Sequence, residues 1–188
     1  MPMAINVGGF SFEDPVGYGE KDDLGGDGSL RRTIYMGITG ISWAEQGDKP
    51  CDVTVRATSL ESTIFRLNSR SKEICTDGTA DLKTVRFSSY KNYLRGIAAC
   101  TTDRKSSSNV CLKGISIYPA EVSSYGSVKE LNTYEEVKHS SCAEWFSPVF
   151  CPSGYVASGL KLSLSGGSFQ GLGLMCRQIT TATSPYKP

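Results

Sequence analysis

The spacing of the cysteines constrains this chain more than any other feature of its sequence. Cys75 and Cys100 are separated by 25 positions, and Cys151 and Cys176 repeat that separation. Each pair encloses two short apolar runs with a polar turn between them, a pattern typical of a β-hairpin. Because a hairpin brings its two ends side by side, we expect the disulfides Cys75–Cys100 and Cys151–Cys176. On the chain-entropy model, closing each loop of about 25 residues would stabilise the fold by roughly 3.5 kcal/mol.

The other three cysteines, Cys51, Cys111 and Cys142, have no partner that the spacing suggests. A total of seven leaves at least one thiol unpaired or available to another chain. Disulfides indicate an oxidising compartment, and hence a secreted protein. The alternative is that the cysteines are free thiols filling equivalent core positions, since cysteine is among the most buried residue types. The first residues lack the charged start and apolar core of a signal peptide, so a cytosolic location stays open.

Other landmarks repeat at nearly the same offset as the cysteines. The tripeptide Gly-Ile-Ser occurs at residues 40–42 and again 74 positions later at 114–116, while Cys75 and Cys151 are 76 positions apart. Repeated landmarks in the same order predict an internal duplication.

We therefore expect one β domain over residues 1–180, with two copies of a unit at about 31–100 and 105–176. Residues 181–188 are typical of a flexible tail. Within each copy, apolar and polar residues alternate over short stretches bounded by Ser, Gly and Asn, which predicts antiparallel strands. The fold class is therefore all-β, built from antiparallel sheets with few short helices.

Two segments have features of both helix and strand. Residues 58–67 and 127–139 each begin with a Ser/Thr-x-x-Glu capping box and carry apolar residues at near-helical spacing. A short helix is expected in 127–139 as readily as a strand.

Three short motifs in the C-terminal copy occur in a characteristic order. They are Cys-Pro-Ser-Gly at 151–154, Gly-Leu-Lys-Leu at 159–162 and Leu-Gly-Leu-Met-Cys at 172–176. The chain in this respect resembles the vitelline membrane outer layer protein family, and residues 75–100 match the same pattern less fully. The resemblance implies a β-prism, in which three sheets surround a pseudo-threefold axis. It also implies a secreted, disulfide-bonded coat or binding protein.

The sequence departs from that family by showing two clear units rather than three. A third sheet would need residues 1–50 and 104–120. The Gly-Gly dipeptide at residues 8–9 is also similar to the opening of jacalin-like lectins, another β-prism group.

Several classes of function find no support in the composition. The net charge is +1 and no dense basic stripe occurs, which argues against a nucleic-acid partner. No apolar run reaches the length of a transmembrane segment. The one histidine, His139, lies beside Lys138 in a charged segment, which favours a solvated side chain over a catalytic base.

No cofactor and no metal are expected. The chain has no Cys-x-x-Cys pair for zinc. The acidic, glycine-rich residues 22–29 lack the spacing of a calcium loop and are more typical of a solvated turn.

Aromatic residues near the expected hairpin turns, at 88–93 and 165–169, are the best candidates for a binding site. They could stack on sugar rings or sit at a membrane interface. The candidate ligand-binding residues are Tyr90, Lys91, Asn92, Tyr93 and Phe169. The alternative is that these rings pack on neighbouring strands.

We expect a non-catalytic extracellular module that binds glycan or a membrane or cell surface. The alternative is a structural coat or matrix protein that associates with copies of itself. A carboxylate-dependent glycan hydrolase is the third hypothesis, but no pair of acids stands out for it, and the adjacent Glu135 and Glu136 are typical of a solvated face.

Overall fold

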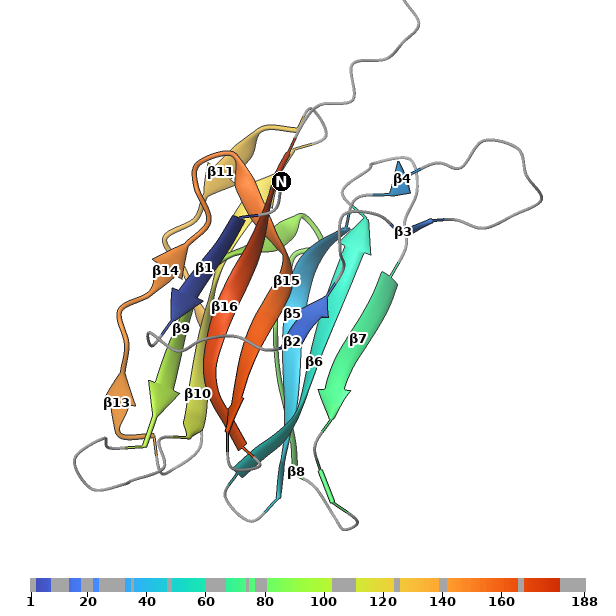
Figure 1. Ribbon diagram of the computed structural model, residues 1–188. Helices are drawn as coiled ribbons and strands as arrows, with labels where there is room; N and C mark the ends of the chain where they lie inside the picture. Colours follow the sequence, from blue (N-terminus) through green and yellow to red (C-terminus); the bar gives the residue numbers. More distant parts are fainter. Residues whose placement is uncertain are drawn as a thin grey trace, which may run out of the picture.

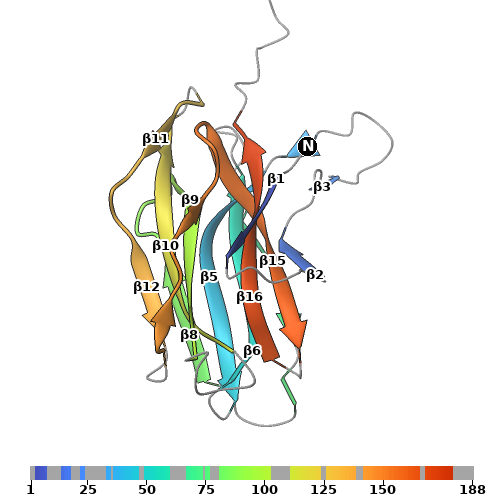
Figure 2. The same cartoon turned by 60° about the vertical axis from the view of Figure 1, so that its left-hand side comes forward.

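Three larger antiparallel sheets form three sides of a prism in the computed structural model of the chain (Figures 1 and 2). The described residues form strands and contain no helix, which confirms the expected all-β fold class. The structure describes residues 3–7, 14–17, 22–23, 33–34, 36–46, 49–59, 67–73, 75–76, 81–102, 111–123, 126–138, 142–165 and 168–179.

The first sheet has the strand order β7-β6-β5-β8. Alternating apolar residues of β5 and β6 face the core, while their polar neighbours face outward. The strands are β5 (Met36–Gln46), β6 (Lys49–Ser59), β7 (Leu67–Glu73) and β8 (Asp81–Arg86).

The second sheet is centred on the antiparallel pair β9 and β10, and short strands flank both sides of it. Strands β11 and β12 pair with β10, whereas β13 and β14 pair with β9. The bounds are β9 (Asn92–Thr101), β10 (Leu112–Val122), β11 (Val128–Glu130), β12 (Glu135–Lys138), β13 (Glu144–Trp145) and β14 (Val149–Phe150).

The third sheet joins the two ends of the described chain in the order β1-β16-β15-β2. Its strands are β1 (Met3–Val7), β2 (Asp14–Gly17), β15 (Tyr155–Ser165) and β16 (Ser168–Gln178). A separate two-stranded pair is formed by β3 (Asp22–Asp23) and β4 (Thr33–Ile34).

The inward faces of the three sheets meet in one hydrophobic core. Fully burying one such aliphatic or aromatic side chain is worth about 1.5–3 kcal/mol. The outer strands of neighbouring sheets also lie beside one another, β8 beside β12, β7 beside β2 and β14 beside β1, which closes the prism along its edges. Fully buried members of the core include Trp43, Ile97, Ile115, Leu160 and Phe169.

A β-bulge occurs at the same place in the central hairpin or strand pair of each sheet. The register shifts immediately before Gly40, Gly114 and Gly159. It shifts again between the fourth and fifth residues after each of these glycines. The three sheets therefore share one geometry, and the Gly-Ile-Ser repeat at 40–42 and 114–116 marks equivalent positions in two of them.

The extra residue of the bulge makes the same hydrogen bond in two of the sheets. The Thr39 hydroxyl donates to the Arg56 carbonyl at 3.4 Å, and the Ser158 hydroxyl donates to the Met175 carbonyl at 3.3 Å. In the second sheet this position is taken by Lys113, whose side chain is buried.

The disulfides differ from the expected set in one respect. Cys151 bonds to Cys176, as the hairpin pattern predicts, because β15 and β16 are antiparallel partners. The predicted Cys75–Cys100 bond is wrong, because Cys75 bonds to Cys51 and Cys100 bonds to Cys142. Cys111 is buried and is not part of a disulfide.

The physical reason is that residues 75–100 do not form a hairpin. Strand β8 pairs with β5 in the first sheet, and β9 pairs with β10 in the second. Residues 87–91 therefore connect two sheets, and the cysteines at the two ends of this segment are not brought together.

The helix considered at 127–139 is replaced by the strands β11 and β12, which pair with β10. Among the described residues, no helix is long and apolar enough to cross a membrane. Residues 60–66, His139, the tail at 181–188 and most of the acidic segment 22–29 lie outside the described residues. The domain boundaries stay a prediction.

Candidate functional site

The turn before β9 presents one of the predicted binding residues to solvent. The backbone amide of Asn92 donates to the Ser89 carbonyl at 3.1 Å, and the backbone amide of Lys91 donates to the Ser89 hydroxyl at 3.3 Å. Tyr90 between them is 75% exposed, with the Lys91 ammonium 5.7 Å from its ring centroid. The Lys91 carbonyl accepts a hydrogen bond from the Val122 amide at 3.0 Å, which ties this turn to the end of β10.

Two of the predicted binding residues are part of the protein interior. Phe169 is fully buried in the main core, and Tyr93 packs with Val122 and Val156 in a smaller cluster. Burial raises the pKa of the Tyr93 phenol above its ordinary value, and the neighbouring Thr58 side chain offsets part of that rise. The expectation that Tyr93 and Phe169 offer their rings to a ligand is therefore wrong.

The outer face of the second sheet is the other part of the described surface where aromatic rings are exposed. Five outward-pointing residues of β9 and β10 are small: they are Gly96, Ala98, Cys100, Gly114 and Ser116. Because these side chains are short, rings from the flanking strands can lie over the central pair. We call this surface the outer face. It comprises the small residues of β9 and β10, the residues of β12, β13 and β14 that cover them, and the adjoining Tyr118 and Tyr134.

At one end of the outer face, Trp145 lies beside Gly114. Trp145 pairs with Cys100, whose sulfur is bonded to Cys142 three positions before the tryptophan. A Cβ added at Gly114 would lie 3.3 Å from Cη2 of the indole and 3.0 Å from Cβ of Cys100. A side chain at this position would require Cys100, Lys138 or the indole to shift by a few tenths of an ångström. Trp145 is 37% exposed.

At the other end, three aromatic rings and one guanidinium group form a continuous ladder. The ring of Tyr134, which is 58% exposed, has its centroid 5.7 Å from that of Tyr118. Tyr118 meets Phe150 edge to face with centroids 5.2 Å apart. The Arg95 guanidinium lies 4.7 Å from the Phe150 centroid. A Cβ on Gly96 would collide with the Phe150 ring, so Phe150 can pack against β9 only because this residue is a glycine.

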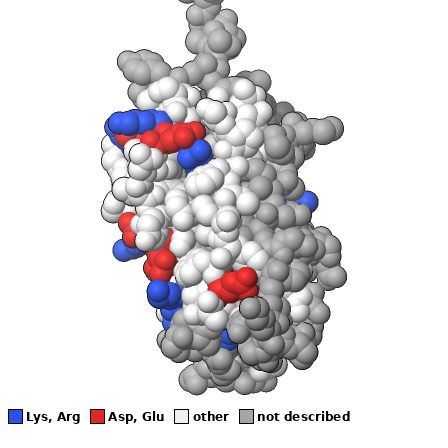
Figure 3. All heavy atoms as spheres, turned by 90° about the vertical axis from the view of Figure 1, so that its left-hand side faces the viewer, with Lys and Arg blue, Asp and Glu red and all other residues white. Residues whose placement is uncertain are grey.

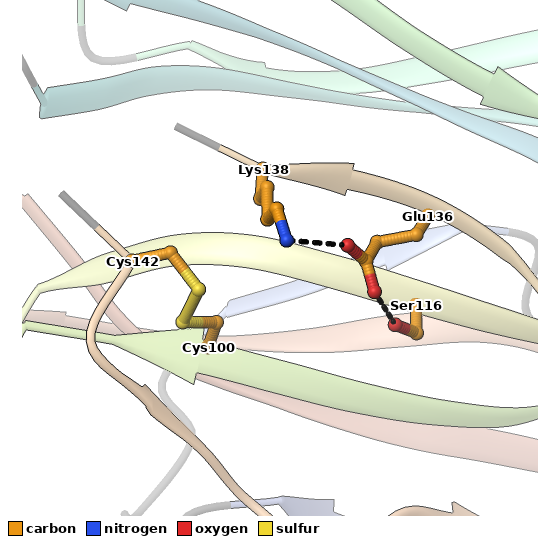
Figure 4. A network of polar contacts seen from close by, with 5 residues as sticks. All are labelled: Cys100, Ser116, Glu136, Lys138 and Cys142. Atoms are coloured by element: carbon orange, nitrogen blue, oxygen red, sulfur yellow. Dashed lines mark hydrogen bonds and ion pairs between the residues drawn. A yellow bond between two sulfur atoms is a disulfide. The ribbon is translucent and has the colours of Figure 1, made fainter. Parts of the chain in front are cut away.

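Between the two aromatic ends lies a polar row. Glu136 accepts a hydrogen bond from the Ser116 hydroxyl at 3.4 Å through one carboxylate oxygen. Its other oxygen is 3.2 Å from the Lys138 ammonium. Figure 4 shows these three side chains linked in sequence, with the Cys100–Cys142 disulfide close by.

Charges on the outer face are paired rather than clustered by sign. Arg95 and Glu130 form an ion pair at 3.0 Å, and Glu136 with Lys138 forms a second. Figure 3 shows groups that contain both colours and, apart from them, a red group with no blue beside it. The pKa of Tyr118 is raised, first by burial and then by the neighbouring Tyr134 and Glu136.

The structure does not favour the carboxylates considered for hydrolysis. Glu135 and Glu136 are consecutive residues of β12, so their side chains leave the strand on opposite sides. Among the described residues, no cluster of three or more His, Cys, Asp or Glu side chains could hold a metal ion.

Sequence analysis did not identify Tyr118, Tyr134 or Trp145 as site residues, and it considered Glu136 only in connection with hydrolysis. One signal was available, namely small residues at alternating positions in both β9 and β10. That pattern indicates that something covers the sheet, but it does not say which segment does so.

Comparison with known proteins supports the fold. No family model and no curated protein matches the sequence. The agglutinin of Calystegia sepium is 15% identical, with 89% of this chain and 96% of the agglutinin covered and a TM-score of 0.50. Frutapin, a lectin from Artocarpus incisa, is 11% identical, with coverages of 88% and 95% and a TM-score of 0.48.

A mannose-specific jacalin-related lectin from Morus nigra, in complex with mannose, is 12% identical, with coverages of 89% and 96% and a TM-score of 0.45. The chain thus has the antiparallel β-prism architecture of jacalin-related lectins. Membership of the vitelline membrane outer layer family stays a prediction.

Proposed function

We propose that this chain is a non-catalytic, secreted module that binds glycans, and that Tyr90, Lys91 and Asn92 contact the sugar. The observation that carries the proposal is the exposure of Tyr90. This residue is 75% exposed and lies on a turn held by backbone hydrogen bonds. A sugar ring can stack on the exposed face of such a phenol, while the Lys91 ammonium and the side-chain amide of Asn92 offer donors to the sugar hydroxyls.

Two further observations support the proposal. Three disulfides fit a protein that folds in an oxidising compartment. The solved structures of similar fold include lectins, one of them in complex with mannotriose. These lectins suggest which sugars to test first, and their low sequence identity limits the inference to that.

Self-association through sheet edges is the less favoured alternative. The outer strands β8, β7 and β14 each lie beside an outer strand of the next sheet, so their edges are covered within the chain.

The test is a glycan array probed with the full chain, followed by titration of the best ligand. Tyr90→Ala is expected to lower affinity about fivefold, since one stacked ring contributes about 1 kcal/mol. Leu82→Ala is the matched control, because Leu82 is 66% exposed on a different sheet. Vesicles of neutral and anionic lipid form the membrane arm. Binding to vesicles without binding to any glycan would refute the proposal, and so would an unchanged affinity in Tyr90→Ala.

A further inference from the structure

The outer face of the second sheet combines three features that occur together nowhere else on the described surface: exposed rings, a polar row and small residues beneath them. We infer that this face is a second saccharide-binding site, separate from the Tyr90 turn, and that it takes an uncharged glycan chain of more than one sugar ring. The inference rests on the proposed function for the class of ligand, and it assigns the ligand a different place and a minimum length.

The two exposed rings are held in place before any ligand arrives. Trp145 is fixed by pairing with β9, by the Cys100–Cys142 bond and by contact with Gly114. Tyr134 is fixed by its ring contact with Tyr118. Rings that are already ordered lose little conformational entropy on binding, so more of the stacking energy appears as affinity.

The polar row supplies hydrogen-bonding groups of both kinds. The Glu136 carboxylate has acceptor sites beyond those used by Ser116 and Lys138, because two oxygens provide about four lone-pair positions. The Lys138 ammonium, whose side chain is 56% exposed, has donors to spare. Sugar hydroxyls both donate and accept, so the row matches the edge of a sugar ring rather than a purely apolar ligand.

The separation of the two rings sets the length of the ligand. Trp145 lies beside Gly114, whereas Tyr134 lies against Tyr118, four residues farther along β10. At about 3.3 Å per residue this is roughly 13 Å along the strand. A single pyranose ring cannot contact both aromatic side chains, but a short chain of such rings lying along β10 can.

The paired charges decide between classes of glycan and against a membrane. Each cation named on this face, Arg95 and Lys138, lies against a carboxylate, so these residues present no excess of positive charge that would attract an acidic polysaccharide or anionic lipid. The polar row also interrupts the apolar surface that insertion into lipid would require.

The first experiment uses the unmodified chain. The protein has two tryptophans, of which Trp43 is 1% exposed and Trp145 is 37% exposed, so their indole N–H signals in ¹H–¹⁵N NMR report on interior and outer face separately. Titration with mannose, mannotriose and longer manno- and cello-oligosaccharides is expected to shift the Trp145 signal with the longer chains and leave Trp43 unchanged. Trp145→Phe assigns the two signals. Absence of any shift at Trp145 with every chain would overturn the inference.

The second experiment measures affinity by calorimetry in variants. Trp145→Ala and Tyr134→Ala are each expected to weaken binding of the longer chain about tenfold, and Glu136→Gln about fivefold. Affinity of the unmodified protein is expected to increase about tenfold from mannose to the longer chains. Thermal unfolding of each variant shows whether the fold is intact, and the NMR titration keeps the inference testable if Trp145→Ala fails to fold.

The outcomes separate the two sites. If Tyr90→Ala alone weakens binding, the proposed function stands and the outer-face site is rejected. If only the outer-face variants weaken binding, the outer-face site stands and the role of the Tyr90 turn is rejected. Equal affinity for mannose and longer chains rejects the extended ligand, and binding of none of these sugars rejects both assignments. An outer face that instead captures a protein partner, with no sugar-dependent shift at Trp145, also overturns the inference.

Discussion

Segments 151–176 and 75–100 begin and end in cysteine at the same separation, but only the first folds back on itself. Strands β15 and β16 remain paired from Tyr155 opposite Gln178 to Ser165 opposite Ser168. Strand β8 instead joins the first sheet, where the Lys83 ammonium lies 3.1 Å from Glu45 and the Thr84 and Ser42 hydroxyls are 3.0 Å apart. Strand β9 then begins a different sheet.

The difference shows what a local pattern can and cannot specify. Only two residues, both glycine, separate β15 from β16, and so short a connection forces the second strand to pair with the first. Five residues separate β8 from β9, which is enough for the chain to cross from one sheet to the next. The two segments therefore have the same cysteine spacing but different structures.

The largest effect is expected from comparing the aromatic residues that the sequence placed at the two turns. Phe169→Ala removes a fully buried core ring and is expected to lower the free energy of unfolding by about 3–5 kcal/mol. Tyr90→Ala, at a 75% exposed position, is expected to change it by less than about 0.5 kcal/mol. Urea denaturation of both variants measures the difference, and similar losses would contradict the burial described here.

The next effect comes from the disulfides at the ends of the two segments. Replacing Cys151 and Cys176 by alanine should cost about 3–4 kcal/mol, because it releases a loop of 25 residues and leaves space in the core. Replacing Cys51 and Cys75 releases a loop of 24 residues and should cost about as much from chain entropy alone.

Single replacements distinguish the cysteine partners. Cys75→Ala should leave Cys51 as a free thiol, and mass spectrometry after alkylation of the unfolded chain identifies it. A newly labelled Cys100 would instead restore the hairpin predicted for residues 75–100.

A smaller effect is expected at one glycine from each segment. Gly96→Ala forces Phe150 away from β9 and should cost about 2 kcal/mol, with loss of the Phe150 contacts to Tyr118 and Arg95. Gly154→Ala meets no atom but places alanine at φ 80°, a left-handed conformation that costs about 1 kcal/mol. Thermal unfolding measures which of the two variants loses more stability. A larger loss in Gly154→Ala would argue against the close packing of Phe150 on Gly96.

The smallest effect concerns the pH dependence of stability, to which Tyr93 in the 75–100 segment contributes. Since burial raises the pKa of this phenol in the folded state, its contribution to stability is complete below about pH 10 and is lost as pH rises through the folded pKa. Tyr93→Phe should therefore flatten the decline in stability above pH 10, while Tyr90→Phe, on the exposed turn, serves as the control. Equal alkaline profiles for both variants would show that the Tyr93 phenol is not buried.

Much of the strand content could be predicted from the sequence, and less of the site. Alternation located β10, β15 and β16, and the Gly-Ile-Ser repeat marked equivalent bulges in two sheets. Residues of the outer face were missed because each owes its exposure to a partner on another strand. The position of Trp145 on the outer face depends on its pairing with Cys100 of β9 and its contact with Gly114, and neither residue is near it in the sequence.

The sequence by itself determined the all-β class, the β15–β16 hairpin and the Cys151–Cys176 bond, because these depend on alternation and on a connection too short to allow another partner. Only the tertiary structure decided that β1 and β2 complete the sheet of the last two strands, that Cys75 and Cys100 have different partners, and that Tyr93 is inside while Tyr134 is outside. The reason is that strand pairing and side-chain burial depend on which sheets face one another, and residues far apart in the chain settle that.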